Sequence, residues 1–271
     1  MANNSDDIMR SAWNTVASAY QKRYKIGTKR IHYGPLCPSD DELKLLGNLA
    51  GTKFLEIGSG AGQNSIVAAK AGADVTAIDI SEKQIEIGKQ ISRDENVNID
   101  FKVGSFLDFS DMDYLDEFDT VLSVYALQYC YDISEMSEVF KAIHKALKPN
   151  GKFIFSLDHP IRSHGNWMGD TFIFDNYFDR SPKEWSYDFP EMNIATPMTG
   201  TYKTIGDYCS CLSSAGFIIQ KILEPEPVAT DDNSKFGQNS RYGVYSKEDP
   251  FSYSRLQRVP GTIIFQATKP Q

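Results

Sequence analysis

Three glycines stand at alternate positions between an apolar segment and an apolar helical pattern: Gly58, Gly60 and Gly62. Glycine is needed where a chain turns sharply and where a ligand must touch the backbone. A carboxylate, Asp79, ends the next apolar segment about 20 positions after Gly58, and at this spacing it can accept hydrogen bonds from both hydroxyls of a ribose. The two features together predict a ligand that contains adenosine.

The loop pattern also indicates which adenosine ligand is bound. A glycine triplet by itself fits a purely structural turn, and Asp79 at its spacing favours a ligand site. The dinucleotide fingerprint needs a third glycine at residue 63, where a helix packs beside a pyrophosphate, and Gln63 occupies that position. The pattern is therefore GxGxG, which makes a nicotinamide-dependent oxidoreductase the weaker alternative.

Five segments together resemble the class I S-adenosylmethionine-dependent methyltransferases. They are LEIGSGAGQN, AIDIS, VGSFLDF, FDTVLSVYALQY and LKPNGKFIFS, and the resemblance extends over nearly all of residues 9–268. A further segment, FSLDHPI at residues 155–161, is similar to a subgroup with small-molecule acceptors and a His-Pro pair after the fifth strand. The resemblance implies S-adenosyl-L-methionine as methyl donor and S-adenosyl-L-homocysteine as product.

Carried over residue by residue, the resemblance implies a complete cofactor site. Glu56 would lie near the methionine amino group, the glycine loop under the cofactor, and Asp79 at the ribose hydroxyls. Ile80 and the loop after the third strand would frame the adenine. The positions implied for the cofactor are Tyr20, Glu56, Gly58, Gly60, Gly62, Gln63, Asp79, Ile80, Gly104, Ser105, Phe106 and Val124. Many relatives carry Asp where Ser105 stands, so Asp108 or backbone is the alternative partner of the adenine amino group.

Aromatic residues are concentrated in residues 158–202 and again in residues 224–259. Although such residues often form the small core of a lid, together they predict an apolar or planar small-molecule acceptor. The resemblance places residues 125–129 beside the reactive methyl group. The candidate acceptor contacts are Tyr24, Tyr33, Tyr125, Gln128, Tyr129, Trp167 and Trp185, and further lid aromatics are Phe236, Tyr242, Tyr245, Phe251 and Tyr253.

His159 is the candidate catalytic residue, because it follows a strand end in the expected cleft and titrates near neutrality. It could accept a proton from a hydroxyl or thiol acceptor. The alternative is a structural hydrogen bond that stabilises the strand exit. Methyl transfer from a sulfonium does not always need a base, so both interpretations stay open here.

Alternating strands and helices must position these residues. Met9, Val16, Ala17 and Tyr20 share one face of a first helix, with Trp13 expected in the core. A short second helix is expected after Ser39. Strands are predicted at residues 53–57, 74–78, 97–103, 118–124, 152–157, 217–223 and 261–268, and helices at 65–71, 83–93, from 132 and from 204 to 215. This order predicts an α/β fold with a doubly wound, seven-stranded mixed sheet, Rossmann-like with an antiparallel last strand, helices on both faces and an inserted lid.

The expected organisation follows from these elements. Residues 1–50 form an N-terminal helical cap, 51–157 the cofactor-binding core, 158–202 a lid insertion, and 203–271 the end of the core with a second insertion at 224–259. Both insertions leave the same edge of the sheet. We therefore expect them to roof one pocket.

Composition limits the partners. A net charge of -8 argues against nucleic acid, because phosphate binding depends on clustered Lys and Arg. The four cysteines show no zinc-type pairing with histidines, so no metal site is expected. The sequence has no signal core and no apolar run of membrane-spanning length, which predicts a cytoplasmic protein. The oligomeric state, and whether O, N, S or C is methylated, stay open, as does a non-catalytic module that only binds the cofactor.

Overall fold

The computed structural model describes residues 2–228 and 251–271, with side chains from residue 5. Its centre is a seven-stranded sheet in the order β10-β11-β5-β4-β1-β2-β3. The strands are β1 (Lys53–Ile57), β2 (Asp74–Asp79), β3 (Asp100–Val103), β4 (Phe118–Val124), β5 (Leu147–Asp158), β10 (Ile218–Leu223) and β11 (Thr262–Thr268). The pairs among β1 to β5 are parallel, whereas β11 runs antiparallel to both β5 and β10. The predicted mixed sheet is confirmed.

Helices cover both faces of this sheet, because alternate strand residues point to opposite sides. In β1, Leu55 and Ile57 pack with one set of helices, whereas Phe54 packs on the opposite face. The first face carries α5 (Phe106–Asp111), α6 (Ile133–Ala146) and α8 (Ile205–Ser214). The second carries α2 (Asp40–Leu43), α3 (Gln63–Lys70) and α4 (Glu82–Asp94).

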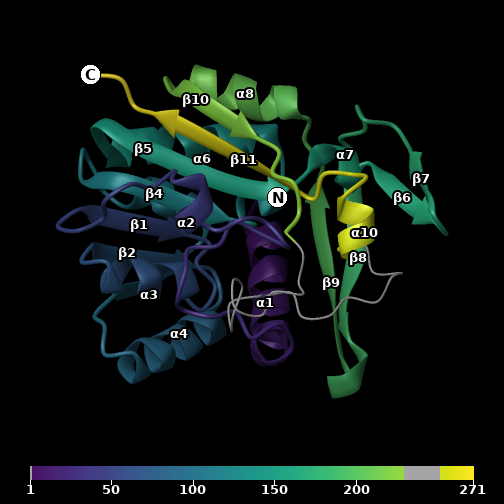
Figure 1. Cartoon of the computed structure of the whole chain (residues 1–271), viewed down its shortest axis with the longest axis horizontal. Coiled ribbons are helices and arrows are strands. Elements are labelled where there is room, and N and C mark those ends of the chain that lie inside the picture. Colours follow the sequence, from purple (N-terminus) through teal and green to yellow (C-terminus); the bar gives the residue numbers. More distant parts are fainter. Residues whose placement is uncertain (1, 229–250) are drawn as a thin grey trace.

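Helix α1 (Ala2–Tyr24) packs outside these layers, against a long hairpin of β8 (Pro182–Phe189) and β9 (Ile194–Thr201), which η2 (Pro190–Met192) joins. Figure 1 shows the helix and the hairpin side by side, beyond the central sheet. Met9, Val16 and Tyr20 form a small core with residues of the hairpin such as Phe189. The N-terminal helix and the insertion therefore stabilise each other over the same region.

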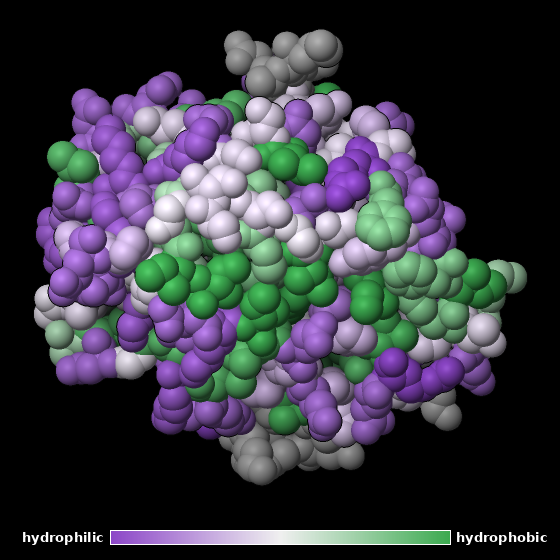
Figure 2. Space-filling model, turned by 90° about the horizontal axis from the view of Figure 1, so that it is seen from above, coloured by the Kyte–Doolittle hydropathy of each residue, from purple (hydrophilic) through white to green (hydrophobic). Residues whose placement is uncertain are grey.

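Residues 158–202 contain further regular structure that the periodicity does not predict. They form α7 (Pro160–Ser163) and a second hairpin, β6 (Gly165–Met168) with β7 (Thr171–Phe174), in addition to β8 and β9. The β6–β7 hairpin protrudes, and Figure 2 shows hydrophobic residues gathered on this protrusion. Met168 and Phe174 are among its exposed apolar side chains.

Several boundaries differ from the sequence prediction. The second helix is a single turn that ends at Leu43, because its C-cap Lys44 has a left-handed φ of 53°. Helix α5 is absent from the prediction, and so are the short helices η1 (Leu127–Tyr129) and α10 (Tyr253–Leu256). Strand β5 begins at Leu147, before the predicted start at residue 152. Ser81, Asp132 and Thr204 are the N-caps of α4, α6 and α8.

Candidate active site

The glycine loop follows β1 and leads into α3, and its three glycines differ in how much space a side chain would have. Gly58 has φ 67°, and a Cβ there would lie 2.2 Å from the Cβ of Ala126. Gly60 has φ 56° and no protein atom within 4 Å of the position of a Cβ, so its backbone is exposed to the cavity beside the loop. Gly62 instead packs against Phe101, 2.8 Å from a would-be Cβ, and does not line that cavity. The packing against Phe101 therefore explains the need for glycine at residue 62, and the expected cofactor contact of Gly62 stays a prediction.

Two buried carboxylates face the cavity from the ends of β1 and β2. Glu56 accepts hydrogen bonds from the backbone N–H and the hydroxyl of Ser65, at 2.9 and 2.5 Å. Asp79 accepts one from the N–H of Gly60 at 2.7 Å and one from the N–H of Ser81 at 2.9 Å. Burial raises the pKa of Glu56 to about 7 and that of Asp79 to about 6.

Neither carboxylate has an ion-pair partner within residues 2–228 and 251–271. A buried carboxylate without a counter-ion is costly unless a ligand supplies the positive charge or the hydrogen-bond donors. An ammonium beside Glu56 and a pair of hydroxyls beside Asp79 would meet these needs. The two carboxylates, as hydrogen-bond acceptors, therefore fit the amino group and the ribose hydroxyls of an S-adenosyl ligand.

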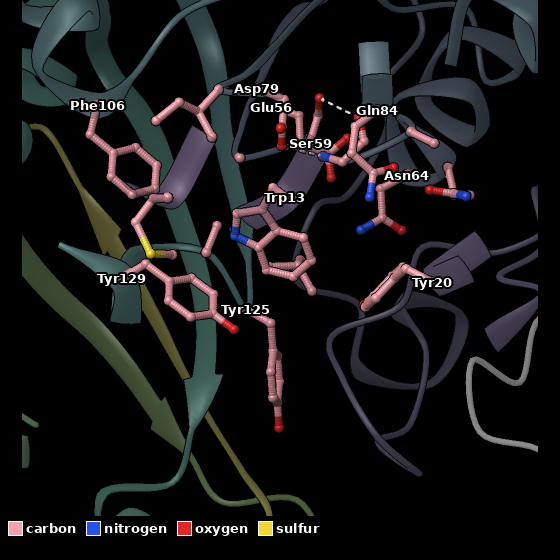
Figure 3. Close-up of a pocket in the computed structure, with 18 of the residues that line it drawn as sticks. Trp13, Tyr20, Glu56, Ser59, Asn64, Asp79, Gln84, Phe106, Tyr125 and Tyr129 are labelled. Atoms are coloured by element: carbon pink, nitrogen blue, oxygen red, sulfur yellow. Dashed lines mark hydrogen bonds between the residues drawn. The ribbon is translucent and has the colours of Figure 1, made fainter. Parts of the chain in front are cut away.

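The first cavity, which we call the cofactor cavity, is enclosed by the glycine loop, by the strand ends and by α1 (Figure 3). The predicted cofactor residues that line it are Tyr20, Glu56, Gly58, Gly60, Gln63, Asp79, Ile80, Gly104, Ser105, Phe106 and Val124. Trp13, expected in the core, lies in the wall of this cavity, and Figure 3 shows its indole between Tyr20 and Tyr129.

Ser105 illustrates how an unpredicted helix changes a residue's role. It is the N-cap of α5, and its hydroxyl oxygen accepts hydrogen bonds from the N–H groups of Leu107 and Asp108. The carboxylate of Asp108 in turn accepts one from the N–H of Ser105. Both side chains thus serve the helix cap, so the hydroxyl of Ser105 can turn only its hydrogen toward the cavity.

Helix α1 closes one side of the cofactor cavity, where its Gln21 joins a chain of hydrogen bonds. Gln21 accepts a hydrogen bond from Gln63 at 2.6 Å and donates one to Gln84 at 2.9 Å. In the middle of the helix, Arg10 and Asn14 both donate hydrogen bonds to the carboxylate of Glu82 on α4. The sequence analysis did not place Gln21 or Gln84 in the cofactor site. The signal that could have indicated them is a polar residue beside the apolar face of each helix.

A second cavity of about 570 Å³, which we call the acceptor cavity, lies next to the first. Tyr125 and Tyr129 line both cavities, so the two meet at the segment after β4. The predicted acceptor contacts in its wall are Tyr24, Tyr125, Gln128, Tyr129, Trp167 and Trp185. Phe251, from the second insertion, also lines it, whereas Phe236, Tyr242 and Tyr245 lie outside the described residues.

The two tyrosines at the junction are held in different ways. Tyr125 has φ 55°, and its hydroxyl lies 2.7 Å from the hydroxyl of Thr262 at the start of β11. The ring of Tyr129 stacks on Trp185 at a centroid distance of 6.3 Å and meets Trp13 edge-on at 5.7 Å. Aromatic faces from α1, the strand end and the hairpin therefore surround the junction.

His159 is not placed for catalysis. Its side chain is fully buried and lines neither cavity. Nδ1 accepts a hydrogen bond from the N–H of Ile161, so the proton resides on Nε2 and is donated to Glu224 at 2.6 Å. Burial lowers the pKa of His159, which opposes protonation. The hydrogen bonds and the burial of His159 favour the alternative interpretation, a structural hydrogen bond at the strand exit, over the predicted catalytic role.

Tyr33, a predicted acceptor contact, also lies away from both cavities. It is fully buried, belongs to the core on the α3 side of the sheet, and lines neither cavity. Its hydroxyl donates to Asp40 at 2.7 Å. The predicted acceptor contact is instead a core residue that anchors the segment before α2.

The described residues contain neither a cluster of metal ligands nor a membrane-spanning helix. Across residues 2–228 and 251–271, no group of three or more His, Cys, Asp or Glu side chains is arranged to hold a metal ion. None of the helices in the same residues has the length and apolarity that a bilayer span requires.

Part of the chain is similar to known methyltransferases. Residues 48–169 match the family model of the methyltransferase domain. A ubiquinone biosynthesis O-methyltransferase from Xanthomonas euvesicatoria pv. vesicatoria is 32% identical over 108 residues, which are 40% of this chain and 44% of that protein. The match spans about half the length of the curated relatives.

Solved structures show the same fold over most of the chain. An S-adenosylmethionine-dependent methyltransferase from Mesorhizobium loti superposes with a TM-score of 0.61 at 23% identity, covering 84% of this chain and 95% of that one. Magnesium protoporphyrin IX methyltransferase from Synechocystis, solved with bound S-adenosylmethionine, gives 0.57 at 17% identity, with 98% and 97% covered.

Proposed function

We propose that the protein methylates a small-molecule acceptor, because residues 48–169 match the family model of the methyltransferase domain and the chain has the fold of solved S-adenosylmethionine-dependent methyltransferases. The donor is S-adenosylmethionine, and the acceptor enters the neighbouring cavity. The observation that carries this proposal is a pair of buried carboxylates, Glu56 and Asp79, that have no ion-pair partner among the described residues. They lie in a cavity that meets a second, aromatic cavity at Tyr125 and Tyr129.

The chain's own residues supply binding and orientation. Glu56 binds the methionine amino group, Asp79 the ribose hydroxyls, and the exposed backbone at Gly60 permits close approach. Phe106 and Ile80 offer apolar surface to the adenine, while Trp13 and Tyr20 on α1 shield the site from water. S-adenosylmethionine supplies an electrophilic methyl group when bound.

The residues of the acceptor cavity align the acceptor and exclude water. Tyr125, Tyr129 and Trp185 surround the junction with aromatic faces, which stabilise a nearby cation and exclude solvent. Holding the acceptor in line with the methyl group at about 3 Å accounts for much of the rate enhancement in such displacements. With His159 in a structural role, the acceptor's nucleophile is not activated by that residue.

A transfer assay tests the proposal. The full chain is incubated with S-adenosylmethionine labelled in the methyl group and a small-molecule extract of bacterial cells. We expect label in the extracted small molecules, its loss in Asp79→Asn, and its retention in Gly51→Ala, which alters a glycine remote from both cavities. Cofactor binding without any transfer would contradict methylation and favour a non-catalytic binding module.

A further inference from the structure

A buried lysine and a partly buried arginine line the acceptor cavity, in a protein whose net charge is -8. Lys203 follows β9 and is 2% exposed, and the side chain of Arg162, on α7, is 13% exposed. Cations are seldom buried to this extent unless they are paired. Neither residue stood out in the sequence, and neither has a role in cofactor binding.

Among the described residues, the hydrogen-bond partners of Lys203 are neutral. Its ammonium donates hydrogen bonds to the backbone carbonyls of Cys130 and Gln128. Within the part of the chain that the structure describes, no carboxylate lies at ion-pair distance from it. An ammonium has three N–H donors, so one is left for a ligand. Burial lowers the pKa of Lys203, and the carboxylates of Glu135, Asp132 and Asp207, which lie beyond ion-pair distance, offset only part of this effect.

Arg162 is only partly paired. One Nη2 hydrogen bond joins it to Asp158, while its Nε is buried with no hydrogen-bond partner among residues 2–228 and 251–271. The guanidinium also lies over the ring of Phe251 at 3.9 Å. A guanidinium carries five N–H donors in a planar fork that matches a carboxylate. Within the described residues, Arg162 therefore has N–H donors that no protein acceptor engages.

One segment connects the two cations. The side-chain oxygen of Gln128 accepts a hydrogen bond from the N–H of Asp158, whose carboxylate holds Arg162. The backbone oxygen of the same Gln128 holds Lys203. Gln128 thus fixes both cations relative to the junction at Tyr129, where the methyl group would be delivered.

We infer that the acceptor is a planar aromatic molecule that carries a carboxylate, held by Lys203 and Arg162 while its ring lies among Trp185, Tyr129 and Trp167. The aromatic walls provide the flat apolar surface, and the two cations provide the charge that this surface lacks. The inference rests on the proposed function, because it specifies the acceptor class of the same site.

Calorimetric titrations test this inference on the full chain saturated with S-adenosylhomocysteine. The probes are benzoate, trans-cinnamate and 2-naphthoate, each compared with its neutral amide of nearly the same shape. We expect at least one carboxylate to bind about tenfold or more tightly than its amide. In Lys203→Met this preference should fall to about one, whereas Lys141→Met, which changes an exposed lysine on α6, should keep it.

The outcomes separate the two proposals. If S-adenosylhomocysteine itself fails to bind, the proposed function fails. If it binds but no carboxylate is preferred over its amide, or if Lys203→Met retains the preference, the inference about the acceptor is overturned alone. The comparison of carboxylate with amide uses the unaltered protein, so it stands even if Lys203→Met does not fold.

Discussion

The carboxylate of Asp79 accepts a hydrogen bond of 2.7 Å from the backbone N–H of Gly60, which links the end of β2 to the glycine loop after β1. This bond fixes the loop beside the carboxylate before any ligand arrives. Because Gly60 has a left-handed φ and an open side toward the cavity, the loop offers bare backbone at the place where the ligand must approach.

Gly60→Ala should therefore block the ligand more than it destabilises the fold. A left-handed backbone costs a non-glycine residue roughly 1–2 kcal/mol, and the added methyl group meets no protein atom. We expect a small loss of stability in urea unfolding, with affinity for S-adenosylhomocysteine reduced at least tenfold. Gly51→Ala is the matched control, since Gly51 also has a left-handed φ and open surroundings but lines neither cavity. Equal affinities in the two variants would refute the placement of Gly60.

Cofactor affinity should depend on pH through Glu56. The ligand-free pKa is about 7, raised by burial, and an ammonium ligand favours the ionised form. Below pH 7 the carboxylic acid must lose its proton on binding, so affinity should fall by up to about tenfold per pH unit. Titrations between pH 7.5 and 6.0 measure this slope, and Glu56→Gln should flatten it. An affinity that rises as the pH falls would count against an ammonium beside Glu56.

The same carboxylate should lower the stability of the ligand-free protein at alkaline pH. Its folded pKa of about 7 exceeds the ordinary value of 4.5, so the folded state binds more protons between these values and stability falls as the pH rises through them. At pH 8, Glu56→Gln should be more stable by up to roughly 3 kcal/mol. Urea unfolding at pH 5 and pH 8 tests this, with the exposed Glu86→Gln as control. A variant less stable than the parent at pH 8 would show that ionised Glu56 is not costly.

His159→Ala should affect folding rather than catalysis. The substitution removes the cap of α7 and leaves the partner groups of the imidazole unsatisfied, a loss of about 1–3 kcal/mol. Thermal unfolding should show the loss, while kcat of the folded fraction should stay within about threefold, and its pH profile should not shift. A kcat that falls a hundredfold without any change in thermal stability would restore His159 as a base.

Local spacing explains which parts of the site could be predicted. Asp79 and the glycine loop lie at strand ends, where the order of strands and helices determines their position. His159 could not be resolved, because its partner Glu224 is 65 residues away in the sequence. Trp13 was expected in the core, since an apolar residue on a helix face packs equally well against a core or around a cavity.

Other features were missed or had no signal in the sequence. In β8 the aromatic residues Trp185, Tyr187 and Phe189 alternate with exposed residues, which is a strand pattern, but it lies inside a long insertion for which no strand was predicted. Lys203 and Arg162 resemble surface cations until the fold buries them. Tertiary context, rather than propensity, determines their roles.

Calorimetric titration of the purified protein with S-adenosylmethionine, S-adenosylhomocysteine and NAD is the most direct measurement. We expect both S-adenosyl ligands to bind, NAD not to bind, and Asp79→Asn to weaken binding at least tenfold, because an amide replaces one acceptor oxygen with a donor. Binding of NAD alone, or of none of the three, would contradict the assignment of the cavity over Gly60 to the methyl donor.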